Sequence, residues 1–153
     1  MPNGRAVNMG DLRVFGNLAP HQTWMEQAGL HICTGKEDAR NVLICTYDNE
    51  SEDPLERLTG TIVPMRDAMT YVQQNDVERV VLISDGAGYA GPRKVANVAK
   101  SATFNDVHGM GSLTSEVLAN IAIKEGIEVL IVRGDPLTEE ATRRTVIDAL
   151  KGN

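Results

Sequence analysis

The chain has 153 residues, enough for one domain that buries roughly two thirds of its unfolded surface. Apolar residues make up 42% and charged residues 24%, as in ordinary globular chains, and no apolar run approaches the roughly 20 residues that span a bilayer. The net charge of −6, with scattered lysines and arginines, excludes a basic surface for nucleic acid. We therefore expect neither a membrane nor a nucleic-acid partner.

The first ten residues are polar, and they predict a loose arm at 1–10 before a single domain at 11–153. This beginning, MPNGRAVNMGDLRVFGN, lacks the apolar stretch of a secretory signal. A cytoplasmic location is the expectation that follows.

Short apolar runs rich in Val, Ile and Leu predict strands that are covered on both faces, as in a parallel sheet. These runs lie at 12–15, 29–33, 41–47, 78–84 and 127–132, with 102–104 as a weaker sixth candidate. Cys33 and Cys45 lie inside two of the runs without the spacing of a metal pair, so we expect buried reduced thiols and no metal site. His31, in GLHICT, is expected to be a core or edge histidine.

Segments with helical spacing separate the runs. Apolar stripes with steps of three and four residues are expected to face the core, and they consist of Ile62, Met65, Met69 and Val72, and of Leu113, Val117 and Ile121. Helix starts are indicated by Pro92 after Gly91, by Ser112, and by Asp135 before a proline. The alternation predicts a single three-layer α/β/α domain with a mostly parallel sheet of five to six strands, Rossmann-like, whose ligand binds at the carboxyl edge.

A glycine-rich turn follows the run at 78–84. The segment VLISDGAGYAGPRKVANVAKSATFND resembles the first unit of a Rossmann dinucleotide enzyme, with Gly86 and Gly88 in the turn and Asp106 twenty residues beyond Gly86. The resemblance implies a nucleotide phosphate on the turn amides. Asp85 would repel pyrophosphate, which leaves a smaller anion as the alternative, and the ring of Tyr89 is placed to cover a ligand.

A second glycine-rich turn, DVHGMGSLTSE, is our preferred anion site, since free amides and hydroxyls precede a predicted helix. The residues expected to bind are Gly109, Gly111, Ser112 and Thr114. An ordinary helix cap at Ser112 would use the same amides. The spacing Asp106-x-His108-x-x-Gly111 is similar to the cobalamin-binding turn, but the later turns of that family are absent, so we assign His108 no cobalt and identify no cofactor.

Aspartate follows four predicted strands, at Asp48, Asp85, Asp106 and Asp135. Asp135 is expected to cap a helix, whereas the other three would need a cation such as magnesium if they converged with a phosphate. Asp48 is therefore a ligand-binding candidate. If the protein is an enzyme, His108 is the predicted acid or base, oriented by Asp85 or Asp106, because histidine titrates near neutral pH.

Two other functions remain open. The element order is similar to mannose-type phosphotransferase IIB subunits, with APHQTW, Asp48 and VHGMG in sequence, which implies a phosphocarrier that uses His21. Alternatively, the turns are structural, and the chain is a non-catalytic scaffold or regulatory subunit that forms homo-oligomers. The primary prediction is a protein that binds a small anionic ligand, phosphorylated or carboxylated.

Overall fold

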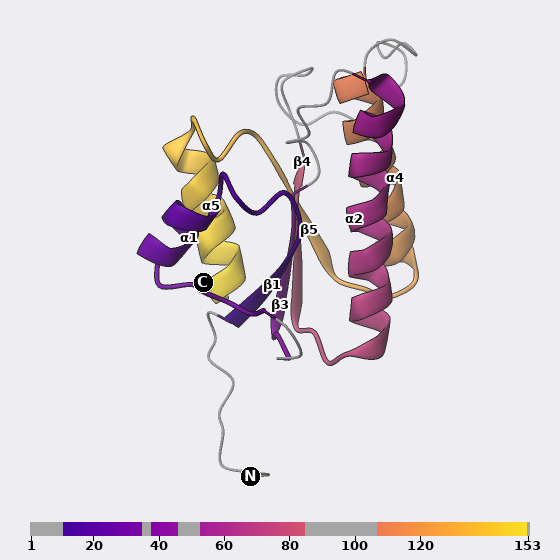
Figure 1. Cartoon of the computed structure of the whole chain (residues 1–153). Coiled ribbons are helices and arrows are strands. Elements are labelled where there is room, and N and C mark those ends of the chain that lie inside the picture. The colour runs from indigo at the N-terminus through magenta and orange to yellow at the C-terminus, as the bar shows by residue number, and fades with distance from the viewer. Residues whose placement is uncertain (1–10, 35–37, 46–52, 85–106, 153) are drawn as a thin grey trace.

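The computed structural model of the chain describes residues 11–34, 38–45, 53–84 and 107–152, with the backbone alone at 54–55, 57–58 and 107–113. Within this part of the chain, five parallel strands form one sheet in the order β2-β1-β3-β4-β5 (Figure 1). The strands are β1 (Asp11–Gly16), β2 (His31–Ile32), β3 (Asn41–Cys45), β4 (Arg79–Ser84) and β5 (Val129–Arg133). The predicted Rossmann-like α/β class is confirmed.

The edge strand β2 is shorter than the predicted run at 29–33. The amide of Leu30 donates a hydrogen bond to the carbonyl of Met25 (3.1 Å). The start of that run therefore belongs to the turn that ends the helix Gln22–Gln27. Only Asp11 with His31, and Leu12 with Ile32, are paired between β1 and β2. This edge of the sheet is therefore held by few ladder hydrogen bonds.

Helices cover both faces of the sheet. Figure 1 shows α1 (Gln22–Gln27) and α5 (Glu140–Lys151) on one face, and α2 (Pro54–Gln74) and α4 (Val107–Lys124) on the other. None of the helices among the described residues is both long enough and apolar enough to cross a membrane. The predicted arm at 1–10, the run at 102–104 and the helix start at Pro92 lie outside the described residues.

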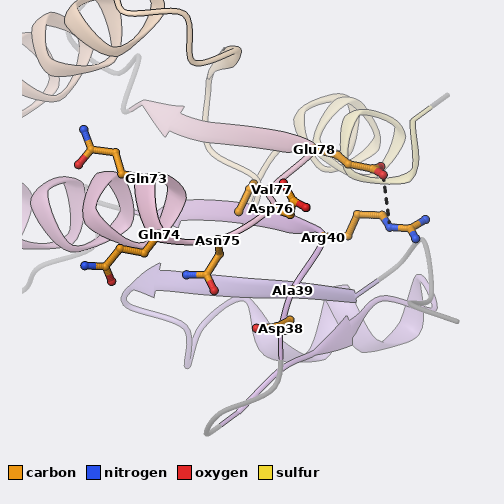
Figure 2. Close-up of a pocket in the computed structure, with 9 residues that line it drawn as sticks. All are labelled: Asp38, Ala39, Arg40, Gln73, Gln74, Asn75, Asp76, Val77 and Glu78. Atoms are coloured by element: carbon orange, nitrogen blue, oxygen red, sulfur yellow. Dashed lines mark ion pairs between the residues drawn. The ribbon is translucent and has the colours of Figure 1, made fainter. Parts of the chain in front are cut away.

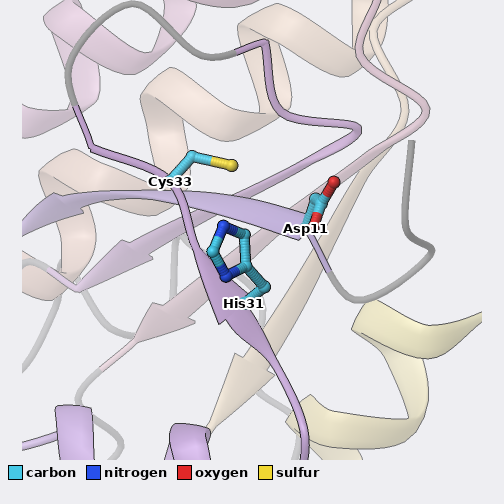
Figure 3. A group of neighbouring side chains, drawn as sticks. All are labelled: Asp11, His31 and Cys33. Carbon is cyan, nitrogen blue, oxygen red and sulfur yellow. The ribbon is translucent and has the colours of Figure 1, made fainter. Parts of the chain in front are cut away.

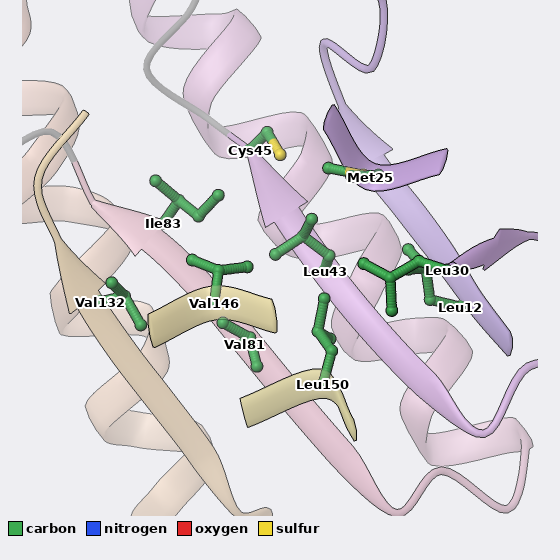
Figure 4. Packing of buried hydrophobic residues seen from close by; sticks show 10 residues of the cluster. All are labelled: Leu12, Met25, Leu30, Leu43, Cys45, Val81, Ile83, Val132, Val146 and Leu150. Atoms are coloured by element: carbon green, nitrogen blue, oxygen red, sulfur yellow. The ribbon is translucent and has the colours of Figure 1, made fainter. Parts of the chain in front are cut away.

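The alternation of side chains along the central strands divides the core into two layers. Leu43 and Val81 point to the face covered by α1 and α5, where they pack with Met25, Val146 and Leu150 (Figure 4). The intervening strand residues belong to the other layer, with Met65 and Ala68 of α2 and Ala119 and Ala122 of α4. Cys33 and Cys45 are both buried, as predicted.

The predicted core stripe of α4 is wrong in part. Val117 and Ile121 are 37% and 49% exposed, and the side chains that face the sheet include Ala119 and Ala122 instead. Small alanine side chains let the helix axis approach the sheet closely. Ser115 and Glu116, which lie nearer the start of the helix, are also buried. On α2, Met65 is fully buried as expected, whereas Ile62 is 37% exposed.

Candidate functional site

The strand order places a topological switch point between β1 and β3. The chain leaves β1 for α1 on one face of the sheet, and it leaves β3 toward α2 on the other face (Figure 1). Neighbouring strands whose helices depart to opposite sides leave a crevice at their carboxyl ends, and open α/β sheets bind ligands there. In this sheet the switch point lies between Gly16 and Cys45, the last residues of β1 and β3.

Gly16 allows the ends of β1 and β3 to approach closely at this point. Its φ of 104° lies in the region that favours glycine, and a Cβ atom at this position would overlap the carbonyl oxygen of Cys45. The next residue, Asn17, donates its backbone amide to the same carbonyl over 3.3 Å, and its side chain is exposed. The close approach of β1 to β3 therefore depends on the absence of a side chain at Gly16.

His21 is the residue directly before α1, which covers one face of the sheet. Its side chain is fully buried, and its Nδ1 atom accepts a hydrogen bond from the indole Nε1 of Trp24 over 3.1 Å. The two rings meet edge to face with centroids 5.9 Å apart. A phosphocarrier histidine has to reach the phosphoryl group of its donor, so this packing does not favour the phosphotransferase alternative.

A buried charged network lies at the carboxyl ends of β4 and β5. Glu116 of α4 is only 3% exposed, and its carboxylate accepts hydrogen bonds from Ser84 Oγ (2.7 Å) and from the guanidinium of Arg133 (2.6 Å). A buried carboxylate requires such a partner, because an uncompensated charge in the interior is strongly unfavourable. The network ties α4 to the carboxyl ends of β4 and β5.

Sequence reasoning did not find this network, although the sequence contains a signal for it. Glu116 is an isolated acid within the apolar helical stretch LTSEVLANIAI, and Arg133 ends the apolar strand VLIVR. An acid among buried helix positions needs a cation on a neighbouring element. The sequence does not show which neighbouring element supplies the cation. The order of the strands identifies it as β5.

Most of the predicted ligand-binding and catalytic residues lie outside the described residues. These are Asp48, Asp85, Gly86, Gly88, Tyr89 and Asp106. In the sequence, Asp48 follows the end of β3 at Cys45, and Asp85 follows the end of β4 at Ser84. Their proposed roles remain predictions.

The second glycine-rich turn requires a correction. Helix α4 begins at Val107, five residues before the predicted start at Ser112, so His108, Gly109 and Gly111 lie in its first turns. In an α-helix the amides of Gly111 and Ser112 are used by the helix itself, and only the amides of about the first four residues remain free. Thr114 lies further along the helix and is half-buried. An anion site at this position would therefore use the backbone of 107–110.

Asp135 does not cap the following helix as predicted. Helix α5 begins at Glu140 with Glu139 as its N-cap, and Asp135 closes a turn before it by accepting a hydrogen bond from the Leu137 amide over 2.9 Å. The carboxylate of Glu139 in turn accepts from the Asp135 amide over 2.8 Å. The side chain of Asp135 is therefore engaged in this turn and does not bind an amide of the helix.

A cavity of about 920 Å³ lies at the opposite, amino edge of the sheet (Figure 2). It is lined by Asp38, Ala39, Arg40 and the segment 73–78, with an ion pair of 3.5 Å between Arg40 and Glu78. The segment includes the carboxyl end of α2, where the helix dipole is negative, and it adds the acids Asp76 and Glu78. This cavity therefore disfavours an anion, and we do not assign the predicted ligand to it.

The sequence matches no known protein-family model and no curated protein. Among solved structures, the fold is similar to a GDP-mannoheptose C4 reductase from Campylobacter jejuni with NADP bound, with a TM-score of 0.59 and 9% sequence identity. The similarity covers 84% of this chain and 52% of the reductase, so the chain spans about half of that protein's length. At such low identity, the likeness establishes the Rossmann-like fold alone.

Proposed function

We propose that this chain binds a phosphorylated or carboxylated small molecule in the crevice between the carboxyl ends of β1 and β3. The observation that carries the proposal is the strand order β2-β1-β3-β4-β5, which puts a switch point between these two strands. Gly16 supports it, because its exposed backbone lies at the end of β1, next to the end of β3. In the sequence, Asp48 comes three residues after the end of β3, and Gly86 comes two residues after the end of β4.

An anionic ligand is favoured by the helix that begins at this edge. Helix α4 starts at Val107, and the amides of its first turn carry the positive end of the helix dipole. NADP is the first probe to test, since the structurally similar reductase has NADP bound. The substrate of that reductase is not transferred to this chain, which spans only about half of its length.

Acid–base chemistry, if the protein is an enzyme, would fall to His108 in the first turn of α4. Histidine is the side chain whose ordinary titration range includes neutral pH, and Asp85 or Asp106 would orient it. This role depends on the ligand site, since a catalytic histidine must lie within hydrogen-bond reach of the bound molecule.

We expect NADP to raise the melting temperature of the protein, and Asn17→Asp to weaken that effect. Ligand at 100 times its dissociation constant adds about 2.7 kcal/mol, or roughly 5–10 °C for a domain of this size. Asn17 is exposed beside the crevice, and a carboxylate there would repel a phosphate by roughly 1 kcal/mol, about a fivefold loss of affinity. Isothermal titration calorimetry measures the affinity directly.

The matched control is Gln73→Glu, which makes the same change of charge at an exposed position of the amino edge. Both variants have the same net charge, so any general electrostatic effect on an anion is equal in the two. Equal affinities of the two variants would contradict the proposed location. A panel of NADP, ATP and inorganic phosphate that leaves the melting temperature unchanged would overturn the proposed function.

A second candidate function is assembly, and it is favoured by the exposed apolar side chains of the helix pair α2 and α4. These helices pack side by side on one face, and Ile62, Val117 and Ile121 are each at least 37% exposed there. Arg66 and Asp67 of α2 add one charge of each sign, so a second copy of this face would not be repelled. We therefore propose a homodimer through α2 and α4 as the alternative.

The variant Ile121→Glu should shift this dimer to monomer without loss of the fold, because Ile121 is 49% exposed in the single chain. Size-exclusion chromatography with light scattering measures the mass over a range of protein concentrations. The control is Leu137→Glu, since Leu137 is 39% exposed outside these helices. A wild-type protein that is monomeric at every concentration would exclude the assembly.

A further inference from the structure

We propose that Asp11, His31 and Cys33 bind a zinc ion at the edge of the sheet. Each side chain offers one ligand atom, and the three atoms all lie within 4.8 Å of one another (Figure 3). The site is separate from the proposed ligand crevice. Asp11 is the first residue of β1 and Gly16 is the last, which places the two sites about 16 Å apart along the strand.

The parallel pairing of β1 and β2 brings the three side chains together. Asp11 is the register partner of His31, so their side chains project from neighbouring positions on the same face. Cys33 lies two residues beyond His31, and side chains two residues apart on an extended segment share a face. The amide of Cys33 donates to the carbonyl of Leu12 over 2.7 Å, which continues the ladder and fixes the position of this residue.

The donor atoms identify the class of metal. A thiolate sulfur, an imidazole nitrogen and a carboxylate oxygen together suit zinc, whereas calcium and magnesium take oxygen ligands. Tetrahedral zinc with bonds of about 2.0–2.3 Å needs ligand atoms about 3.5 Å apart, a separation that small side-chain rotations would provide. Three protein ligands leave the fourth position for water.

The environment of the three residues allows an ion to enter and to be held. His31 is exposed on the edge strand, which opens the site to solvent, while Cys33 is buried with 6% exposure. On the inner side, the Nδ2 atom of Asn41 donates to the backbone carbonyl of Asp11 over 3.2 Å and anchors the start of β1. The ligands therefore project from a backbone that is already positioned.

Zinc binding would convert the Cys33 thiol to a thiolate and release its proton to solvent. The thiol lies 4.0 Å from the carbonyl oxygen of Asp38, a weak contact that the metal bond would replace. The ion would join β2, with its two paired residues, to β1 by bonds that do not depend on the ladder. We infer a structural clip for the edge strand.

The experiment uses the full chain, stripped of metal by a chelator and titrated with Zn²⁺, with Mg²⁺ as the comparison. We expect one Zn²⁺ per chain, a melting temperature that rises with zinc concentration, and proton release in weakly buffered solution. Co²⁺ as a spectroscopic substitute should give a sulfur-to-metal charge-transfer band. No such changes are expected with Mg²⁺.

The matched variants are Cys33→Ala and Cys45→Ala, because both remove a buried thiol and only the first removes a proposed ligand. Cys33→Ala should lose the cobalt band and weaken zinc binding at least tenfold, whereas Cys45→Ala should retain both. Should Cys33→Ala fail to fold, His31→Gln and Asp11→Asn test the site at residues that are not buried, and Asp67→Asn is the exposed control for Asp11→Asn. Each ligand variant should weaken zinc binding at least tenfold.

Absence of Zn²⁺ binding at micromolar concentrations by the folded wild-type chain would overturn the proposal. Zinc affinity that is unchanged in His31→Gln and Asp11→Asn would also overturn it, since the ion would then lie elsewhere. Neither result would affect the proposed binding of a phosphorylated or carboxylated molecule at the opposite edge.

Discussion

Gly16→Ala should destabilise the protein by about 4 kcal/mol and lower its melting temperature by roughly 8–16 °C. Two costs combine in this variant. The backbone at Gly16 has a φ of 104°, which side chains disfavour by about 1–3 kcal/mol, and the added Cβ would overlap the carbonyl oxygen of Cys45. Relief of that overlap requires the ends of β1 and β3 to separate. Urea unfolding followed by circular dichroism measures the loss.

Gly126→Ala is the control that separates the two costs. Gly126 has a similar φ of 94°, but a Cβ there would meet no atom within 4 Å. We expect this variant to lose only about 1 kcal/mol, from backbone strain. If both variants lost the same free energy of unfolding, the tight contact between the ends of β1 and β3 would not be a determinant of the fold.

The contact at Gly16 also concerns the proposed function, because it lies at the switch point. A separation of β1 and β3 would change the geometry of the proposed ligand site. We therefore expect any folded Gly16 variant to bind NADP more weakly than Gly126→Ala does.

Arg133→Met should destabilise the protein by about 3 kcal/mol, because it leaves the carboxylate of Glu116 without its cation in the interior. Glu116 is 3% exposed, whereas the side chain of Arg133 is 30% exposed, so we expect the lower end of the range for a broken buried pair. Methionine retains most of the apolar contact of the arginine stem. Thermal and urea unfolding measure the change.

The double variant Glu116→Gln with Arg133→Met tests whether charge is the cause. Glutamine cannot carry the buried charge, so the double variant should be more stable than Arg133→Met alone, a strong departure from additivity. Arg144→Met is the surface control, since Arg144 and Glu140 form an exposed ion pair that should contribute under about 0.5 kcal/mol. If the double variant lost as much free energy of unfolding as the two single variants together, the proposed penalty for an unpaired buried carboxylate would be contradicted.

The class of fold could be predicted from the sequence, because it depends on local composition. Runs such as VVLIS and NVLIC, apolar at successive positions, are stable only when both faces of a strand are covered. Helical stretches between such runs require crossover connections and hence parallel strands. The ligand at the carboxyl edge remains a prediction. The structure shows that β3 and β4 end at the same edge.

Helix boundaries were predicted less well. The local signals for alternative boundaries differ by less free energy than the tertiary contacts contribute, so these contacts decide between them. The glycines at 109 and 111 favour a turn by about 1 kcal/mol each, yet the structure continues α4 through them to Val107. Asp135 is a good cap residue, but its hydrogen bond to Leu137 forms a turn first, and α5 starts at Glu140.

Taken by itself, the sequence determined which segments must be buried and that the strands must be parallel, since apolar patterning and connection length act within a segment. Only the tertiary structure decided which elements became neighbours. The pairing of β1 with β2 brought Asp11 to His31, the position of α4 brought Glu116 to Arg133, and the order β1-β3 placed Gly16 against Cys45. These contacts join residues 17 to 29 positions apart, and their free energy is gained only after the sheet has assembled.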